Sequence, residues 1–389
     1  MSDHPHLASS RPGLDVFLGV VQFLFLLSWV VYVVFLDSLL AKLGLPKEYA
    51  PRLLLVDQGL FALADVALGL QADRLLRAWG RVAPLLVVLN LLACLAFVVL
   101  PGAAGVAPEL FFGLTALWVL SASALRAPLY GLIARRAEAP ARRSAAALLG
   151  MGLASALAPY LGQAMKGLDP FLPFLVSGIV LALASLGFAS LERGLSGGAG
   201  AQAPTPARQP LAPRWLLTAL LLGLGFQIHA FINAAPLYKQ FADPGQLPWL
   251  LPVFWIGFSL AVYPGSALVR RQGARRVLAV AALLGALASG ACPLAPNLAF
   301  LLALQGLAGG AWGACLLAGL TVAGAAGHVG REALFVGGWF ACLAVAAMLR
   351  IGLGLAGIGF DPHLTPALAA GFWLAGALPL LAWMKSLND

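Results

Sequence analysis

Residues Leu14 to Leu36 read LDVFLGVVQFLFLLSWVVYVVFL, an apolar run in which Asp15 is the single charged residue. A helix that crosses a bilayer needs about 20 consecutive apolar residues, so this run is long enough to span a membrane. It is too long for the core of a signal peptide, and no small-residue cleavage site follows it. We therefore expect it to stay in the mature protein as the first membrane span.

The rest of the chain repeats this pattern. Of its 389 residues, 61% are hydrophobic and 10% are charged, and the mean hydropathy is +0.92. Such a composition does not suit a water-facing surface. We predict an all-α integral membrane protein with short loops. Its twelve transmembrane helices are expected near residues 14–36, 51–70, 82–101, 109–133, 144–165, 171–190, 215–237, 248–268, 277–295, 299–325, 333–356 and 366–384.

Basic residues are divided unevenly between the two sides that these spans define. With both termini on one side, that side collects 17 Lys and Arg residues and the other side 6, while Arg126 lies inside a span. Cytoplasmic loops carry such an excess. We therefore predict a multi-pass protein of the bacterial inner membrane with both termini in the cytoplasm. The same bias explains the net charge of +9 without a nucleic-acid partner.

A stretch rich in Gly, Pro and Ala divides the spans into two sets of six. Residues 192–213 have no apolar face and are predicted to be a flexible cytoplasmic linker. Residues 1–13 are then a cytoplasmic tail, 14–191 a first six-helix bundle and 214–389 a second. The basic loop after span 2 has a counterpart after span 8. Two such repeats around an axis normal to the membrane predict pseudo-two-fold symmetry between the bundles.

These two loops resemble the motif that the major facilitator superfamily carries between spans 2 and 3. The first copy reads Gly69-Leu-Gln-Ala-Asp73-Arg74, but five residues precede Gly80 where the family pattern has one. The second copy keeps Gly265 and Arg270 and lacks the acid. Gly permits close packing, and Asp73 can stabilise a helix end that faces an Arg. The resemblance implies conformational gating by Gly69, Asp73, Arg74, Gly265 and Arg270; a short polar turn is the alternative.

Span 5 resembles the Gly-Pro-x-x-Gly-Gly element of the exporters in that superfamily. It keeps Pro159 and Gly162, whereas Ala158 and Gln163 stand in place of two glycines. The element would kink span 5 and give it a smooth face against span 8. We add Pro159 and Gly162 to the gating residues; an ordinary kink without any link to export is the alternative.

Three charged residues inside spans are candidates for proton coupling. Charges at the centre of a span cost about 2.5 to 3.5 kcal/mol and usually face the interior of the bundle. Asp57 and Asp65 lie on span 2 and Arg126 on span 4. Asp65 and Arg126 are both expected about 12 to 14 Å above the cytoplasmic loops, so we predict that they pair and take part in coupling. A static ion pair between spans 2 and 4 is the alternative.

The resemblance implies that spans 1, 4, 7 and 10 line a central cavity. On span 7, His229 and Asn233 are four residues apart and therefore share one side of the helix. We expect them to face Trp29 and Tyr32 of span 1 across that cavity, which would suit an organic solute, anionic or aromatic. Packing and interhelical hydrogen bonds are the alternative for each residue. The full predicted set is Gln22, Trp29, Tyr32, Arg126, His229, Asn233, Gln305 and Trp312.

These features favour a secondary active transporter that moves a small organic solute by alternating access. Proton coupling and export are expected options, and facilitative or exchange transport without protons is an alternative. A membrane sensor or scaffold that has lost transport is a third. The sequence has no Walker loop and no HExxH motif, so neither an ATP-driven pump nor an enzyme is predicted.

The remaining expectations concern cofactors and partners. Cys94, Cys292, Cys315 and Cys342 all lie in apolar runs, and methionines are few, so we expect neither a disulfide framework nor a metal site. No cofactor is predicted. The expected partners are a small-molecule substrate, protons and the lipid bilayer, and we expect a monomer.

Overall fold

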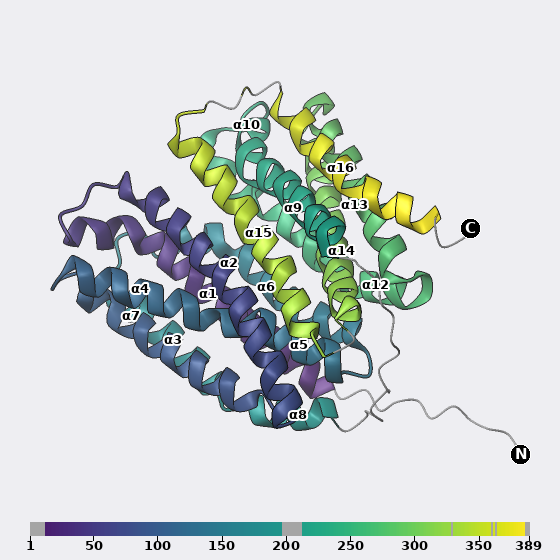
Figure 1. The fold of residues 1–389 in the computed structure, drawn as a ribbon. Coiled ribbons are helices and arrows are strands. Elements are labelled where there is room, and N and C mark those ends of the chain that lie inside the picture. The colour runs from purple at the N-terminus through teal and green to yellow at the C-terminus, as the bar shows by residue number, and fades with distance from the viewer. Residues whose placement is uncertain (1–11, 197–211, 328–329, 359–360, 362–363, 386–389) are drawn as a thin grey trace, which may run out of the picture.

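Long apolar runs punctuated by Pro, Gly and Arg become the helices of this chain, which run lengthwise beside one another in the computed structural model (Figure 1). The structure describes residues 12–196, 212–327, 330–358, 361 and 364–385. Residues 1–11 of the predicted tail and 197–211 of the predicted linker lie outside the described residues. Within the described ranges the regular secondary structure is entirely helical.

Residues 192–196 and 212–213 of the predicted linker are helical, so the helices fall on both sides of a shorter segment, 197–211. Before it lie α1 (Pro12–Lys42), α2 (Tyr49–Ala78), α3 (Ala83–Ala103), α4 (Pro108–Ala122), η1 (Ser123–Leu125), α5 (Ala127–Arg136), α6 (Pro140–Ala164), α7 (Phe171–Ser185) and α8 (Phe188–Ser196). After it lie α9 (Ala212–Ile228), η2 (His229–Asn233), α10 (Ala234–Tyr238), η3 (Pro244–Gln246), α11 (Leu247–Leu250), α12 (Pro252–Gln272), α13 (Ala274–Ala291), η4 (Cys292–Leu294), α14 (Leu298–Ala326), α15 (Glu332–Leu355) and α16 (Thr365–Lys385).

Eleven helical segments of the described chain are long and apolar enough to cross a membrane. Several predicted spans are composed of more than one helix: span 4 covers Pro108–Arg136, span 6 Phe171–Leu195 and span 7 Trp215–Tyr238. The predicted span 12 coincides with α16, whose described apolar part, Thr365–Leu380, is shorter. A twelfth crossing and the pseudo-two-fold symmetry therefore stay predictions.

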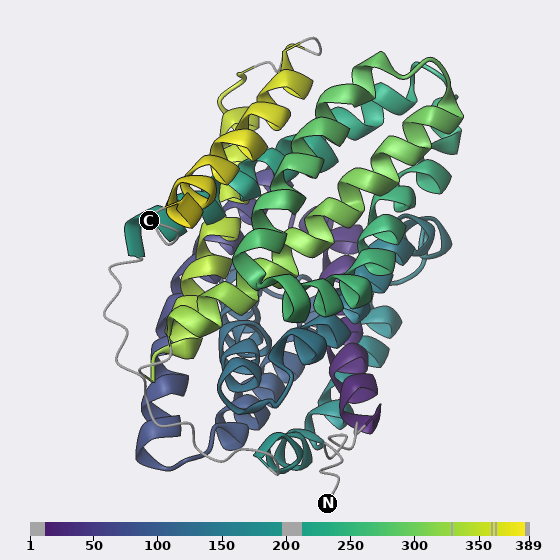
Figure 2. The ribbon, with the colours of Figure 1, turned by 90° about the vertical axis from the view of Figure 1, so that its right-hand side faces the viewer.

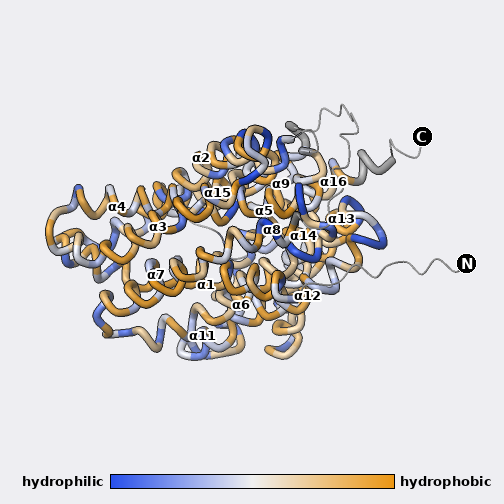
Figure 3. The backbone as a smooth tube through the Cα atoms, turned by 90° about the horizontal axis from the view of Figure 1, so that it is seen from below, coloured by the Kyte–Doolittle hydropathy of each residue, from blue (hydrophilic) through white to orange (hydrophobic). Residues whose placement is uncertain are grey.

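The outside of the bundle is apolar. Leu63, Leu260 and Leu287 are each more than two-thirds exposed, on three different helices. Figure 3 shows hydrophobic residues along the lengths of the helices and hydrophilic stretches chiefly in the connections between them. Large apolar side chains spread over the surface in this way suit lipid rather than water.

The two halves of the chain meet along two helix pairs, α2 with α15 and α6 with α12 (Figures 1 and 2). Glycines bring the backbones close. A Cβ on Gly337 of α15 would lie 2.2 Å from the carbonyl oxygen of Asp65 on α2, and one on Gly152 of α6 would lie 2.5 Å from Oγ of Ser259 on α12. The expected packing of span 5 against span 8 is thus observed.

The C-terminal end of α2, which extends through residues predicted to form the loop after span 2, fastens the two halves at one end. Both oxygens of the buried Asp73 accept hydrogen bonds from α15, from the backbone N–H of Ala333 (3.0 Å) and of Leu334 (2.9 Å). The carboxylate thus satisfies free N–H groups in the first turn of α15 and complements its dipole. Arg77 donates to the Gly330 carbonyl beside it. Gly69 permits this approach, since a Cβ there would lie 2.4 Å from the Ala333 carbonyl oxygen.

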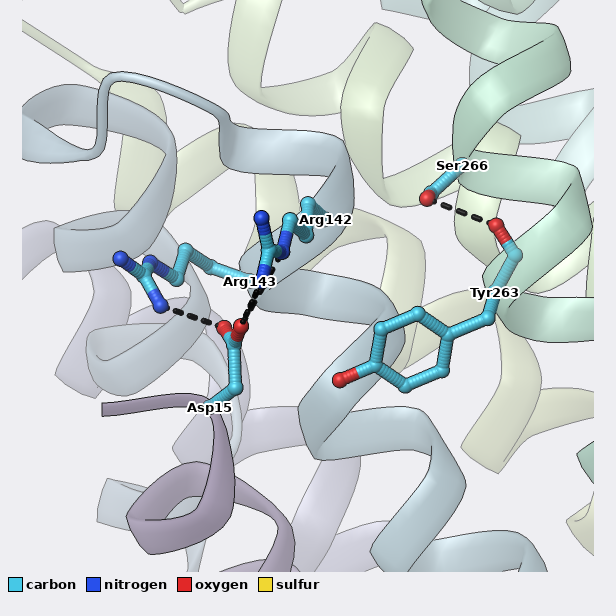
Figure 4. A network of polar contacts seen from close by, with 5 residues as sticks. All are labelled: Asp15, Arg142, Arg143, Tyr263 and Ser266. Atoms are coloured by element: carbon cyan, nitrogen blue, oxygen red, sulfur yellow. Dashed lines mark hydrogen bonds and ion pairs between the residues drawn. The ribbon is translucent and has the colours of Figure 1, made fainter. Parts of the chain in front are cut away.

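The second copy of the motif makes a different set of contacts. A Cβ on Gly265 would meet Leu317, a residue of the same half, at 3.4 Å, and Arg270, like Arg74 of the first copy, is exposed. Near this part of α12, Asp15 at the start of α1 pairs with Arg142 (3.0 Å) and Arg143 of α6. Figure 4 shows Tyr263 of α12 with its ring directed toward this cluster. A gating role for either copy remains a prediction.

Candidate functional site

A cavity of about 220 Å³ lies between the two halves. Its walls come from α6, η2, α10, α12 and α14, and from Leu251, the residue between α11 and α12. It is lined by Ser155, Ala158, Pro159, Ala230, Phe231, Ala234, Tyr238, Leu251, Phe254, Trp255 and Gln305. Pro159, which the sequence assigned to gating, therefore forms part of its wall.

Buried polar groups without partners lie in and next to the wall of this cavity: Gln305 and Tyr238 line it, whereas His229 and Asn233 do not. Nε2 of His229 lies 3.1 Å from Oε1 of Gln305, and because an amide oxygen only accepts, the imidazole donates. Among the described residues, Nδ1 of His229, Nε2 of Gln305, the hydroxyl of Tyr238 and both amide atoms of Asn233 have no hydrogen-bond partner. These side chains are at most 3% exposed. Unsatisfied groups at that depth are costly unless a ligand or water completes them.

The helix geometry of span 7 places His229 and Asn233 here. Residues His229–Asn233 form a π-helical turn in which the N–H of Ala234 donates to the carbonyl of His229, five residues back. Pro236 follows this turn and has no N–H to donate to a preceding turn. Single π turns within α-helices occur frequently at functional sites.

Trp312 belongs to the packing beneath the cavity. Its ring stacks on Phe226 with centroids 4.3 Å apart and is 2% exposed. It also contacts Trp373 edge to face. The side chain supports α9 and α14, and it is absent from the lining of the cavity.

Trp29 and Tyr32 lie in a separate cluster of the first half. Trp29 packs against Tyr32, Phe61 and Trp118, with ring centroids 5.4 to 5.8 Å apart. The buried hydroxyl of Tyr32 donates to Oδ2 of Asp57 at 3.0 Å. The cavity described above takes no lining residue from α1. His229 and Asn233 are not among its lining residues either, so the structure does not bring these four predicted residues to the wall of one cavity.

The expected pair between spans 2 and 4 is present. Nη2 of Arg126 lies 3.0 Å from Oδ2 of the fully buried Asp65. The guanidinium also lies over the rings of Phe61 (4.7 Å) and Phe340 (5.0 Å). The charge of Arg126 is thus compensated within the protein.

Arg126 lies at a break in span 4. Its backbone (φ −107°, ψ −98°) separates η1 from α5, where Pro128 begins the next helical turn. Gln22 of α1 donates to the carbonyl of Leu125 at 2.6 Å and so completes a group that the break leaves open. Gln22 is occupied by this contact, which favours the interhelical alternative for that residue.

Four residues of this region were not singled out from the sequence as members of the site. Ser155 and Phe231 line the cavity, and Arg350 of α15 donates from Nε to Oε1 of Gln227 at 2.8 Å. Arg350 stands six residues before the predicted end of span 11 and is one of the six basic residues that the predicted topology counts on the outer side. The direction of the helix is the signal that could have identified Arg350. Side chains lean toward the N-terminus of their helix, so a residue near the outer, C-terminal end of α15 leans into the membrane.

The chain has the fold of the transporters of the major facilitator superfamily, as its loop motif implies. Two solved transporters of that superfamily match over nearly the whole chain: the Escherichia coli fucose:proton symporter FucP, with a TM-score of 0.66, 12% identity and coverage of 94% of this chain and 97% of that chain, and the nucleoside transporter NupG, with a TM-score of 0.60, 13% identity and coverage of 95% and 99%.

Similarity in sequence is much more limited. The niacin transporter NiaP of Acinetobacter baylyi is 33% identical over 95 residues, which is 24% of this chain. The match spans 21% of the length of NiaP. No family model matches the sequence. These proteins are transporters rather than enzymes.

Proposed function

We propose that the protein is a secondary active transporter that carries a small organic solute across the bacterial inner membrane by alternating access. The observation that carries this proposal is the cavity between the two halves, with the unpartnered amide nitrogen of Gln305 and the unpartnered phenol of Tyr238 at its wall, and the imidazole of His229 hydrogen-bonded to Gln305. A membrane protein with this fold and with buried hydrogen-bonding capacity left open is suited to bind and release a polar solute.

The position of the cavity supports alternating access. Ser155 lies fifteen residues along α6 from its first residue, Pro140, which corresponds to about 22 Å of rise from the predicted cytoplasmic end. The contacts of Asp73 with α15 lie at that cytoplasmic end. The halves are thus fastened on one side of the solute site, and release of this fastening would expose the site to the cytoplasm.

Size and chemistry limit the solute. A cavity of about 220 Å³ suits a solute of one or two rings or a single sugar. The aromatic residues Phe231, Phe254 and Trp255 offer stacking surfaces, and the open groups of Gln305 and Tyr238 offer hydrogen bonds. Niacin, nucleosides and fucose, the solutes in the names of the similar transporters, are therefore the first ligands to test.

Thermal-shift measurements on purified protein test this proposal. A panel of small carboxylates, amides, nucleosides and sugars should contain solutes that raise the unfolding temperature in a saturable manner, because a ligand that binds only the folded state stabilises it. Variants of Asn233 should lose the shift. Saturable shifts that survive in those variants would move the solute site out of this cavity.

Both termini and the linker are proposed to lie in the cytoplasm, on the basis of the charge distribution. A variant with Ser196→Cys in an otherwise cysteine-free chain should be labelled by an impermeant thiol reagent only after the cells are opened. Labelling of intact cells would reverse the orientation.

A further inference from the structure

Arg350 is a cation inside a predicted membrane span, and no acid among the described residues pairs with it. Its Nε donates to Oε1 of Gln227, and its guanidinium carbon lies 4.9 Å from the ring centroid of Phe231. The ion pairs of the described residues include Arg126 with Asp65, and Arg142 and Arg143 with Asp15, but none of Arg350. Arg126 and Arg350, the two cations that lie within predicted spans away from their ends, therefore differ in kind: one is neutralised and the other is not.

The depth of the Arg350 guanidinium argues against its contact with water at the outer face of the inner membrane. Gln227 lies eleven residues before Tyr238, the last residue of α10, so it is about 16 Å below the outer end of that span. Arg350 reaches toward Gln227 rather than outward. A cation held at that position costs several kcal/mol unless an anion or water compensates it.

The guanidinium also has unused donors on its accessible side. Nε is occupied by Gln227, while Nη1 and Nη2 have no acceptor among the described residues. Nη1 and Nη2 are not among the fully buried polar atoms that lack a partner, and the Arg350 side chain is partly exposed. Both atoms can therefore reach a ligand. Two free Nη groups of one guanidinium match the two oxygens of a carboxylate.

We propose that Arg350 is the anion-recognising residue of the solute site and that the transported solute carries a carboxylate. Arg350 is not itself a lining residue of the cavity, but its guanidinium lies over the ring of Phe231, which is. The solute would pack against Phe231, with its carboxylate on the guanidinium of Arg350 and its remaining polar groups toward Gln305 and Tyr238. This inference rests on the proposed function and specifies its substrate class.

Matched pairs of probes test the assignment. Nicotinate with nicotinamide, and benzoate with benzamide, differ only in carboxylate against carboxamide. In wild-type protein at least one carboxylate should bind saturably, at least tenfold more tightly than its amide. Arg350→Gln should weaken that carboxylate at least tenfold and bring it close to its amide, and Arg350→Lys should retain part of the difference.

Two controls keep the result interpretable. Lys239→Gln removes an exposed cation just beyond α10 and should change the affinity less than twofold. Each variant is compared with the wild type only if it is equally monodisperse and unfolds at the same temperature without ligand. If Arg350→Gln does not fold, the inference is tested on Arg350→Lys and on the ratio of carboxylate to amide affinity in the wild type.

Binding of neutral solutes with no carboxylate preference, or unchanged carboxylate affinity in Arg350→Gln, would overturn the inference and leave the transporter proposal intact. Absence of saturable binding by every solute would count against both.

Discussion

At the scale of single residues, the site depends on side chains whose hydrogen bonds are incomplete. His229 and Gln305 hold each other in place, and Asn233 has two open amide atoms beside them. Gln22, which has the same chemistry, is used up on the Leu125 carbonyl. The residue type alone therefore does not distinguish an amide with open hydrogen-bonding groups from an amide whose groups are satisfied. The difference lies in the contacts that each amide makes in the folded protein.

Removal of the open groups should weaken solute binding without unfolding the protein. We expect His229→Ala and Asn233→Ala each to cost about 1 to 3 kcal/mol of binding free energy for the solute found by thermal shift. Calorimetric titration measures this. Gln22→Ala is the matched control, and it should lower stability while it leaves the affinity within twofold. Equal affinities in wild type and both site variants would contradict the assignment.

Asp65 is the residue that we propose for proton coupling. Asp65→Asn should abolish accumulation driven by a pH gradient and leave solute exchange measurable, because exchange needs no net proton movement. Since the change leaves the Arg126 charge uncompensated, we expect a loss of about 3 kcal/mol of stability. Uptake into vesicles with and without a pH gradient gives the readout.

A second variant separates coupling from structure. Asp65→Asn with Arg126→Gln removes both charges and should regain stability. Gradient dependence that persists in this folded double variant would reduce the pair to a static fastening of α2 to α5.

At the scale of elements, interruptions in two spans position the site. Span 4 breaks at Arg126 ahead of Pro128, and span 7 widens into a π turn ahead of Pro236. The sequence predicted both spans, since apolar length is a local property. The breaks were missed because a proline in a span is compatible with several local solutions, and packing against neighbouring helices selects among them.

The contact between α2 and α15 gives a prediction for an element as a unit. Gly337→Ala would place a Cβ 2.2 Å from the carbonyl oxygen of Asp65, so α15 must move away from α2. We expect a loss of about 1 to 3 kcal/mol of stability and slower transport. Gly371→Ala on α16, where a Cβ meets nothing within 4 Å, should behave like wild type. Identical unfolding and transport in the two variants would show that the close contact of α15 with α2 at Gly337 is not required.

At the scale of the whole molecule, the sequence predicted the fold better than the site. Apolar runs and charge distribution identify spans one at a time, and the loop around Asp73 pointed to the superfamily fold that the solved transporters share. The placement of Trp29 and Tyr32 opposite His229 required knowing how the two halves pack. That information resides in contacts such as α6 with α12, which no local pattern of residues encodes.

Solute transport by the purified protein tests the central claim most directly. Protein in liposomes preloaded with the solute found by thermal shift should take up labelled solute by counterflow, saturably and above empty liposomes. Ala234→Trp, which fills the cavity wall, should abolish counterflow, whereas Leu368→Trp at an exposed position of α16 should not. Saturable binding without counterflow in the folded wild-type protein would contradict the account and indicate a sensor or scaffold instead.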